Sequence, residues 1–317
     1  IMRFTLLGRG ALLGALAVLF LVRPVAAQTT FVWDGGGGNL NWGLAGNWEP
    51  NGAPANATAS FVFDAANVTG TQADLWRPNN NLSGLTFTGL TIRGSRPEWT
   101  NNPGGGWDIR GGTHVLSGDV TASGGTHRYG GASTLGADVT VNVVDQSLSW
   151  SSNIAESGSR SLIKTGAGTL VLSGSPAYSG TTTINGGVLE FSGANSTGDN
   201  SAMELAGGTV RFSGGGTRSN TISGTGNLEK TGANTLVLAG TNSYTGTTHV
   251  LGGALLITGD SSAATGSLMV SPGATFGGSG QFGGEVWFDV GARLPLTLGA
   301  TLTLAPAGQF FTARAAG

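Results

Sequence analysis

Short runs of alternating apolar and polar residues, separated by glycine, make up most of this chain. Thr169 to Leu172, Thr181 to Ile184 and Val188 to Phe191 are three such runs, each rich in β-branched or large apolar residues. Glycine pairs or serine-glycine steps separate them, as is typical of tight turns between strands. No apolar stripe of helical period is present, and each glycine inside a helix would cost about 1 kcal/mol. The pattern predicts an all-β protein built of short strands.

A long internal repeat organises these strands. The segment 162–193 recurs as 228–259. Glycine turns also recur at a shorter step, as from Gly187 to Gly208, which is close to the shortest periods of solenoid repeats. We interpret the short step as one coil and the long repeat unit as three coils of 22. Such periods indicate a β-solenoid, in which each coil buries its apolar face by stacking on the next.

The residues expected to matter most in these coils are structural. A residue with positive φ carries little penalty only when it lacks a Cβ, so the paired glycines are predicted to close the turns. The apolar positions of the strands are predicted to face the core, and about ten stacked coils would form a rod on the order of 50 Å long. The turn residues are Gly186, Gly187, Gly252 and Gly253, and the core positions are Leu170, Leu172, Leu236 and Leu238.

Composition supports an ordered protein and excludes several kinds of site. Hydrophobic residues make up 39% of the 317 residues and charged residues only 10%, which argues against disorder. There is no cysteine, which excludes disulfides and thiolate ligands or nucleophiles. The net charge of −2 and the lack of a basic patch give no reason to expect nucleic acid as a partner.

The first third of the chain divides into two further segments. Residues 1–27 are predicted to be a signal peptide, because basic residues precede the apolar run 11–22 and small residues end at Ala27. Residues 28–104 are rich in Trp and Asn, and we expect them to form a cap merging into the first coils, because an open solenoid end would expose strand edges. Residues 105–317 are then the glycine-rich solenoid. We expect the natural chain to continue past Gly317.

The tryptophans of the cap have two interpretations. Exposed indole rings could stack on the sugar rings of a glycan. Packing is favoured, because a cap over a glycine-rich solenoid has few other bulky residues with which to fill space. The rings concerned are Trp33, Trp42, Trp48 and Trp76.

The repeated segments carry a family resemblance. The Lys164-Thr-Gly-Ala-Gly-Thr-Leu-Val-Leu core, the following Tyr178-Ser-Gly-Thr, and Ile184-Asn-Gly-Gly-Val-Leu resemble the autotransporter-associated β-strand repeat, also called the passenger-associated transport repeat. The opening Trp33-Asp-Gly-Gly-Gly-Gly-Asn is similar to the region that often precedes such repeats. The resemblance implies a right-handed parallel β-helix that is exported as the passenger of a bacterial surface protein. It implies no enzymatic activity.

Candidate chemistry outside the repeats is sparse. Asp119 and Asp138 are separated by about one coil and could meet on adjacent coils as a calcium or acid/base pair, but solvated turn residues are the favoured interpretation. His114 and His127 have no partner at a metal-ligand spacing and are predicted to be surface residues. No serine lies in a nucleophile elbow. We therefore predict no catalytic residue, no metal and no cofactor.

The sequence thus predicts an exported, non-catalytic β-helical passenger that acts as a surface stalk or adhesin-like protein, with repeats that assist secretion and display. The expected partners are a translocator barrel or outer-membrane export machinery, and surface glycans or a neighbouring cell. The expected location is the outer surface of a Gram-negative bacterium. The alternative is a carbohydrate-binding or polysaccharide-degrading β-helix, since that fold also hosts lyases and hydrolases.

Overall fold

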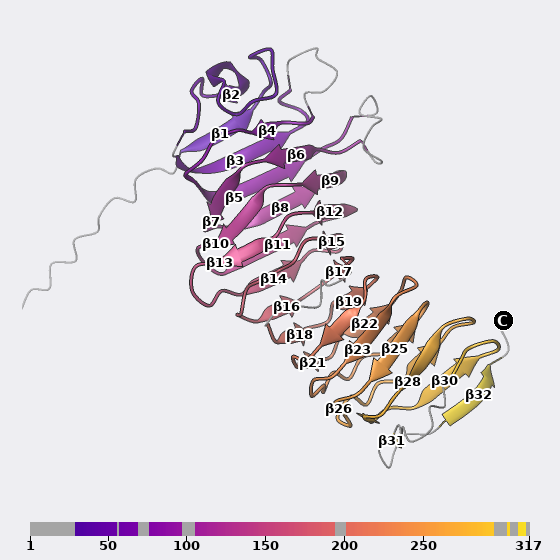
Figure 1. Ribbon diagram of the computed structural model, residues 1–317. Coiled ribbons are helices and arrows are strands. Elements are labelled where there is room, and N and C mark those ends of the chain that lie inside the picture. Colours follow the sequence, from indigo (N-terminus) through magenta and orange to yellow (C-terminus); the bar gives the residue numbers. More distant parts are fainter. Residues whose placement is uncertain are drawn as a thin grey trace, which may run out of the picture.

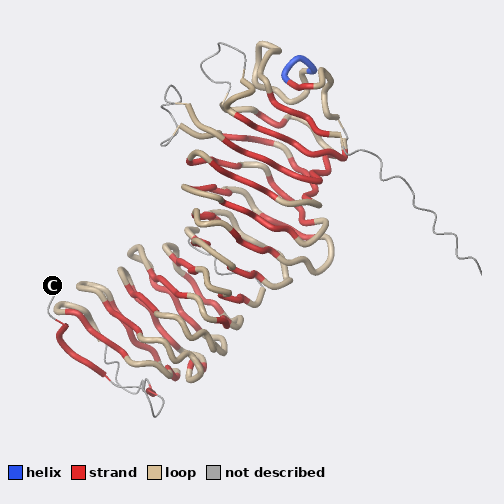
Figure 2. Tube along the Cα trace, turned by 180° about the vertical axis from the view of Figure 1, so that it is seen from behind, coloured by secondary structure: helices blue, strands red, loops and turns tan. Residues whose placement is uncertain are grey.

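The structure, a computed structural model, is a stack of short strands that forms a bent rod (Figures 1 and 2). It describes residues 29–55, 57–68, 76–96, 105–193, 201–294, 303–304 and 310–314. The predicted signal peptide, residues 1–27, lies outside the described residues. Within them the one helical element is a short 3-10 turn, η1 (Ala45–Asn47). No helix in these ranges is long and apolar enough to cross a membrane.

One parallel sheet runs along most of the rod, and we call it the long face. Its twelve strands stack in the order in which they occur along the chain. At ~4.8 Å between neighbouring strands, twelve strands span roughly 50 Å, as expected from the coil count. The strands are β4 (Asn79–Asn80), β6 (Asp108–Gly111), β9 (Thr126–Tyr129), β12 (Ser147–Trp150), β15 (Thr169–Leu172), β17 (Val188–Phe191), β19 (Thr209–Phe212), β22 (Asn227–Lys230), β24 (Thr248–Val250), β27 (Leu268–Val270), β30 (Val286–Asp289) and β32 (Phe310–Arg314).

Each coil continues from the long face to a second face and then to a third. The second face holds β7 (Thr113–Leu116), β10 (Ala132–Leu135), β13 (Ile154–Glu156), β20 (Gly216–Arg218), β23 (Thr235–Leu238), β25 (Ala254–Ile257) and β28 (Thr275–Gly278). The third face holds β8 (Val120–Ser123), β11 (Val139–Val143), β14 (Leu162–Thr165), β16 (Thr182–Ile184), β18 (Met203–Leu205), β21 (Ile222–Gly224), β26 (Asp260–Ser261), β29 (Gln281–Phe282) and β31 (Thr303–Leu304). All pairs between coils are parallel, which confirms the predicted β-solenoid.

A Trp-rich cluster closes the N-terminal end of the stack. It is built on β1 (Thr30–Trp33), β2 (Trp48–Glu49) and β3 (Thr58–Asp64), and the long strand β5 (Leu85–Arg93) joins it to the coils. β5 pairs with β7 through its first half and with β8 through its second half. The second and third faces therefore both start from this one strand.

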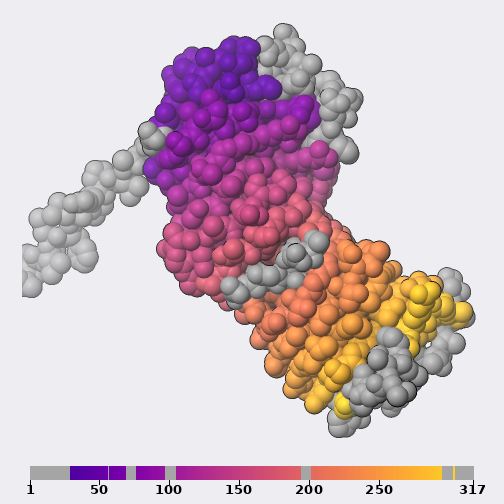
Figure 3. Space-filling model, viewed as in Figure 1, coloured from indigo at the N-terminus to yellow at the C-terminus, as the bar shows by residue number. Residues whose placement is uncertain are grey.

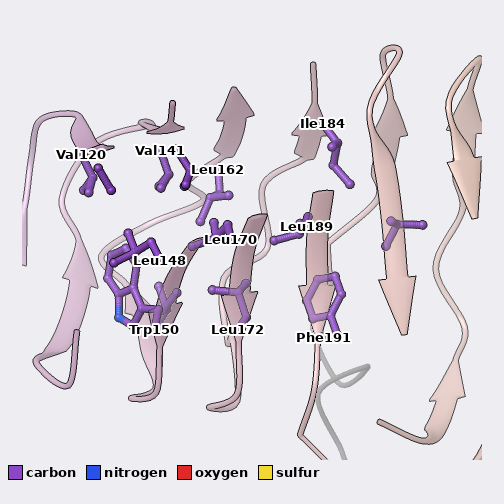
Figure 4. Packing of buried hydrophobic residues seen from close by; sticks show 14 of the residues in the cluster. Val120, Val141, Leu148, Trp150, Leu162, Leu170, Leu172, Ile184, Leu189 and Phe191 are labelled. Atoms are coloured by element: carbon purple, nitrogen blue, oxygen red, sulfur yellow. The ribbon is translucent and has the colours of Figure 1, made fainter. Parts of the chain in front are cut away.

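The core is a column of inward-facing side chains between the faces. Figure 4 shows Val141 and Leu162 of the third face pointing toward Leu148 and Leu170 of the long face. All four predicted core leucines are buried, which confirms the inward direction of alternate strand positions: Leu170, Leu172, Leu236 and Leu238. The column also contains pairs of aromatic rings, and those of Phe191 and Phe212 on adjacent coils stack with centroids 5.5 Å apart.

The two long repeats lie on different faces of the solenoid. In the first repeat the leading strand is β14, on the third face, whereas its equivalent in the second repeat is β22, on the long face. Along the third face, the residues that follow Leu162 on the next three coils are Thr182, Met203 and Ile222. Three coils from Leu162 thus end at Ile222, and Leu228 follows one face later. The interpretation of the repeat unit as three coils of 22 was therefore wrong, because the unit is three shorter coils plus one face.

The rod bends between β17 and β19, with the earlier coils forming one straight stack and the later coils another (Figures 1 and 3). The long face stays paired across the bend, through the register Phe191 to Phe212.

Candidate functional site at the repeated lysine turns

Both repeats place a lysine inside the solenoid core. Lys164 stacks between Val141 and Ile184 on the third face, and Lys230 between Phe212 and Val250 on the long face. Each lysine is 0% exposed. These are the only two lysines in the sequence, so the chain uses this residue for one kind of position.

Each ammonium group is held by the backbone of two successive coils. Lys164 Nζ donates to the carbonyl oxygens of Thr165 (2.6 Å) and Gly166 (3.0 Å) in its own turn, and of Gly186 (3.2 Å) in the next coil. This set uses all three donors of a lysine ammonium. The lysine therefore ties the turn of one coil to the turn of the next.

The second repeat reproduces this arrangement. Lys230 Nζ donates to the carbonyl oxygens of Thr231, Gly232 (3.1 Å) and Gly252 (3.4 Å). The first two belong to its own turn and the third to the glycine pair of the following coil, as in the first repeat.

The electrostatics of the site are set by burial. Desolvation lowers the pKa of Lys164 to about 8 and also lowers the pKa of Lys230. Carbonyl dipoles that point at the ammonium favour its charged form, so Lys164 is mainly protonated at neutral pH. No carboxylate is needed, because the backbone oxygens supply the partial negative charge.

The paired glycines that receive these lysines have unequal roles. Gly187 has φ of 60° and Gly253 has φ of 64°, and a Cβ at either would clash with carbonyl oxygens of the preceding coil. A Cβ at Gly186 would lie 3.5 Å from the nearest atom, and one at Gly252 would lie 3.3 Å away. The second glycine of each pair is thus required by backbone conformation and space, whereas the first has ordinary φ and more room, most at Gly186.

A tyrosine and a threonine brace the same repeat from inside. Tyr178 OH lies 2.8 Å from Thr182 Oγ1, and Tyr244 OH lies 2.7 Å from Thr248 Oγ1, with all four side chains buried. The glycine between them cannot carry a side chain, because a Cβ at Gly180 would collide with the backbone of Arg160. The Tyr-x-Gly-Thr-Thr stretch therefore fixes a second turn of the repeat.

The cap tryptophans are part of the core. Trp33, Trp42 and Trp48 are 0% exposed, and Trp76 is 2% exposed. Trp42 stacks on Phe61 with centroids 5.4 Å apart, and Trp48 packs edge-on against Trp42 at 5.2 Å. The expectation of core packing fits this burial. The glycan-stacking hypothesis required exposed rings, and in the structure none of the four presents a face to solvent.

Two histidines predicted at the surface are buried instead. His114 is 5% exposed and His127 is 0% exposed. His127 Nε2 donates to Ser123 O (3.0 Å), and its Nδ1 accepts from Trp107 N (3.1 Å), which defines a neutral ring. The alternation along β7 indicated this burial, because His114 and Leu116 lie on the same side of the strand.

A buried contact between a serine hydroxyl and a histidine ring also belongs to the core. Ser133 Oγ and Tyr129 OH both lie 2.9 Å from His114 Nε2. Burial lowers the pKa of His114 to about 3, so the ring is a weak base at neutral pH. The trio makes these hydrogen bonds within the solenoid, and His114, at 5% exposed, lies at the edge of a depression that Thr113 and Val115 also line.

The acidic candidates form single turn contacts. Asp119 Oδ1 accepts a hydrogen bond from Thr140 N (2.9 Å), and Asp138 Oδ1 accepts one from Ser161 N (2.9 Å). Each carboxylate thus caps the backbone of the next coil. Within the described ranges no three His, Asp or Glu side chains gather where a metal ion could be held.

Sequence reasoning found the repeats but missed the role of their lysines. The alternation of inward and outward positions indicated that the lysines are buried. Lys164 lies on the same side of its strand as Leu162, and Lys230 on the same side as Leu228. A lysine that recurs at an inward position between apolar residues is expected to be buried. Its ammonium group then needs hydrogen-bond acceptors, which the backbone carbonyl groups supply.

The comparisons with known proteins match the same two segments. The model of the passenger-associated-transport-repeat family matches residues 162–191 and 228–257. The adhesin BmaC autotransporter of Brucella suis biovar 1 (strain 1330) is 50% identical over 70 residues, which cover 22% of this chain and 2% of that adhesin. No solved structure matches the chain. The chain therefore carries two passenger-associated-transport-repeats, which are set into a parallel β-solenoid on different faces.

Proposed function

We propose that this chain is a passenger segment of an exported Gram-negative surface protein, where it serves as a non-catalytic, adhesin-like stalk. The similarity to an autotransporter adhesin and the two family repeats support this proposal. A continuous sheet of twelve strands gives the segment the length and stiffness of a spacer. A translocator barrel or the outer-membrane export machinery is the corresponding partner.

The observation that carries the proposal is the contact between successive coils at each lysine turn. A coil that emerges outside the membrane can bury its apolar face only by stacking on its neighbour. Lys164 and Lys230 each bind a carbonyl oxygen of the adjacent coil, which fixes the register of the two coils. We propose that the repeats assist secretion in this way, because each stacked coil holds the chain outside.

Surface display tests the proposal directly. An epitope inserted after Gly158, where a Cβ would meet no atom within 4 Å, reports the chain on intact bacteria that express the whole natural protein. We expect antibody staining of intact cells and loss of the epitope on protease shaving. Staining of lysed cells alone would contradict surface display.

The role of the lysines is tested by variants in the same assay. Replacing both lysines by methionine should lower surface staining severalfold while the protein accumulates inside the cell. The matched control is Arg128→Met, which changes an exposed cation on the long face. If the double lysine variant and Arg128→Met are displayed equally well, the lysines have no role in secretion, and the stalk proposal is unaffected. Release of reducing sugar from polysaccharides by the purified chain would contradict the non-catalytic part.

A further inference from the structure

We propose that the outer surface of the long face near Trp287 is a binding subsite for a sugar ring of a neutral glycan. The proposal does not depend on how the chain is exported, because it requires only the folded solenoid.

Trp287 differs from the other tryptophans that the structure describes. Six of those, in the cap and in the first coils, are no more than 2% exposed: Trp33, Trp42, Trp48, Trp76, Trp107 and Trp150. Trp287 lies at an outward position of β30 and is half-buried. Trp287 is therefore the one described indole that lies on the outer surface of the sheet.

The neighbours of Trp287 form a row along the rod. The parallel register aligns His249, Met269 and Trp287 on three successive coils. Coils are ~4.8 Å apart, so the thioether of Met269 lies beside the indole at about the width of a sugar ring. A sugar presents a face of C–H groups, and an indole with an adjacent polarizable sulfur is a suitable surface for it.

A second row supplies polar groups at the edge of the first. Thr247 and Ser267 lie two positions before His249 and Met269, hence on the same outer side of their strands. Backbone hydrogen bonds keep this row aligned, since Thr248 N donates to Ser267 O (2.9 Å) and Leu268 N to Glu285 O (2.7 Å). The hydroxyl and carboxylate groups of this row can bond the hydroxyls at the rim of a sugar.

The two rows enclose a concave site. Thr247, Ser267, Met269 and Trp287 line a depression of about 320 Å³. This volume lies at the lower end of the range for small-molecule pockets and suits one or two sugar rings.

The charge of the site selects among sugars. The four described residues that line the depression are uncharged, and the polar row ends at Glu285. A carboxylate at the rim repels uronic and sialic acids, whereas it accepts hydrogen bonds from neutral hexoses. The occupant we infer is therefore a neutral hexose polymer.

The test uses the purified full chain in a glycan array, followed by titration calorimetry. The probes are galactomannan and soluble β-glucan oligosaccharides as neutral ligands, and oligogalacturonate as the acidic one. We expect neutral oligosaccharides to bind at about millimolar Kd or tighter, as one stacked ring allows. Trp287→Ala should weaken binding at least 10-fold, and Trp287→Phe should weaken it less.

The matched control is Leu251→Ala, because Leu251 is an exposed apolar residue (48%) that follows β24 and does not line the depression. The affinity of Leu251→Ala for neutral oligosaccharides should stay within 2-fold of that of the parent chain. Equal losses for Leu251→Ala and Trp287→Ala would indicate a nonspecific apolar surface and overturn the site. Absence of neutral binding, or preference for oligogalacturonate, would overturn it as well. If Trp287→Ala lowers the melting temperature, Trp287→Phe decides, since it keeps an aromatic ring on the sheet.

Discussion

Lys164 Nζ donates a hydrogen bond of 3.2 Å to the carbonyl oxygen of Gly186, a residue that lies 22 positions later and one coil further along the rod. Lys230 and Gly252 repeat this relationship. Two sequence features that look unrelated, a lysine before one turn and a glycine pair at another, are therefore the two halves of one contact.

Chemical labelling checks this burial. The folded chain should show no amine modification by an acylating reagent at Lys164 or Lys230, because both residues are 0% exposed and these are the only lysines. Denaturant should expose both to rapid labelling, which mass spectrometry of the peptides would detect. Rapid labelling of either lysine under native conditions would contradict the buried contact.

Replacing Lys164 by methionine should lower the free energy of unfolding by about 1–3 kcal/mol. The variant leaves buried carbonyl oxygens without their donor, and an unsatisfied buried polar group costs about that much. Lys164→Arg should not restore stability, because a planar guanidinium cannot match three acceptors arranged around one ammonium. Urea denaturation followed by circular dichroism measures both variants, and full rescue by arginine would argue against the geometry.

The glycine pair gives a matched comparison in adjacent positions. Gly187→Val should destabilise the coil by more than about 2 kcal/mol, since its φ of 60° is strained for a β-branched residue and its Cβ would clash with the preceding coil. Gly186→Ala should change stability by less than about 1 kcal/mol, because its Cβ would have 3.5 Å of space. Thermal melts of the two variants measure the difference. Similar melting temperatures for both would show that the turn does not depend on positive φ.

The cap offers a second comparison, between two buried tryptophans. Trp48 Nε1 donates to Trp42 O at 2.9 Å, whereas Trp42 Nε1 has no hydrogen-bond partner. Trp48→Phe should therefore cost about 1 kcal/mol more than Trp42→Phe, because it leaves the Trp42 carbonyl unpaired in addition to reducing volume. Near-ultraviolet circular dichroism and urea denaturation would show the order, and the reverse order would contradict the hydrogen bond.

Much of the fold follows from the sequence because period-2 alternation and glycine spacing are local signals. Thr169 to Leu172 and Val188 to Phe191 were predicted with the bounds that the structure has. The shift of the second repeat by one face was not predictable in the same way. A corner of the solenoid takes only a short stretch of chain, so the interval from Lys164 to Lys230 fits three coils of 22 as well as three shorter coils and one further face.

The candidate site was less accessible to sequence reasoning. The glycine pairs were identified, but the unequal roles of Gly186 and Gly187 depend on the approach of the preceding coil, which only the stacked structure defines. His114 was placed at the surface because polar residues usually lie there, although its strand parity indicated the core. Trp287 was not singled out, although alternation within β30 places it outward. The residues beside it depend on the register of the last coils, which the sequence does not define.

Acid pH should destabilise the chain through its buried histidines. Burial lowers the pKa of His114 from 6.5 to about 3 and also lowers the pKa of His127. Between pH 3 and 6.5 the unfolded chain therefore binds more protons than the folded one, so stability is fully present above pH 6.5 and falls as the pH drops. The free energy of unfolding falls by at most about 1.4 kcal/mol per pH unit for each histidine. Denaturation at pH 7 and pH 5 should show this loss. His114→Gln and His127→Gln should each reduce this loss of stability. Leu251→Ala, which changes an exposed residue without a titrating group, should leave it unaltered. An unchanged slope in His114→Gln would show that other groups control acid stability.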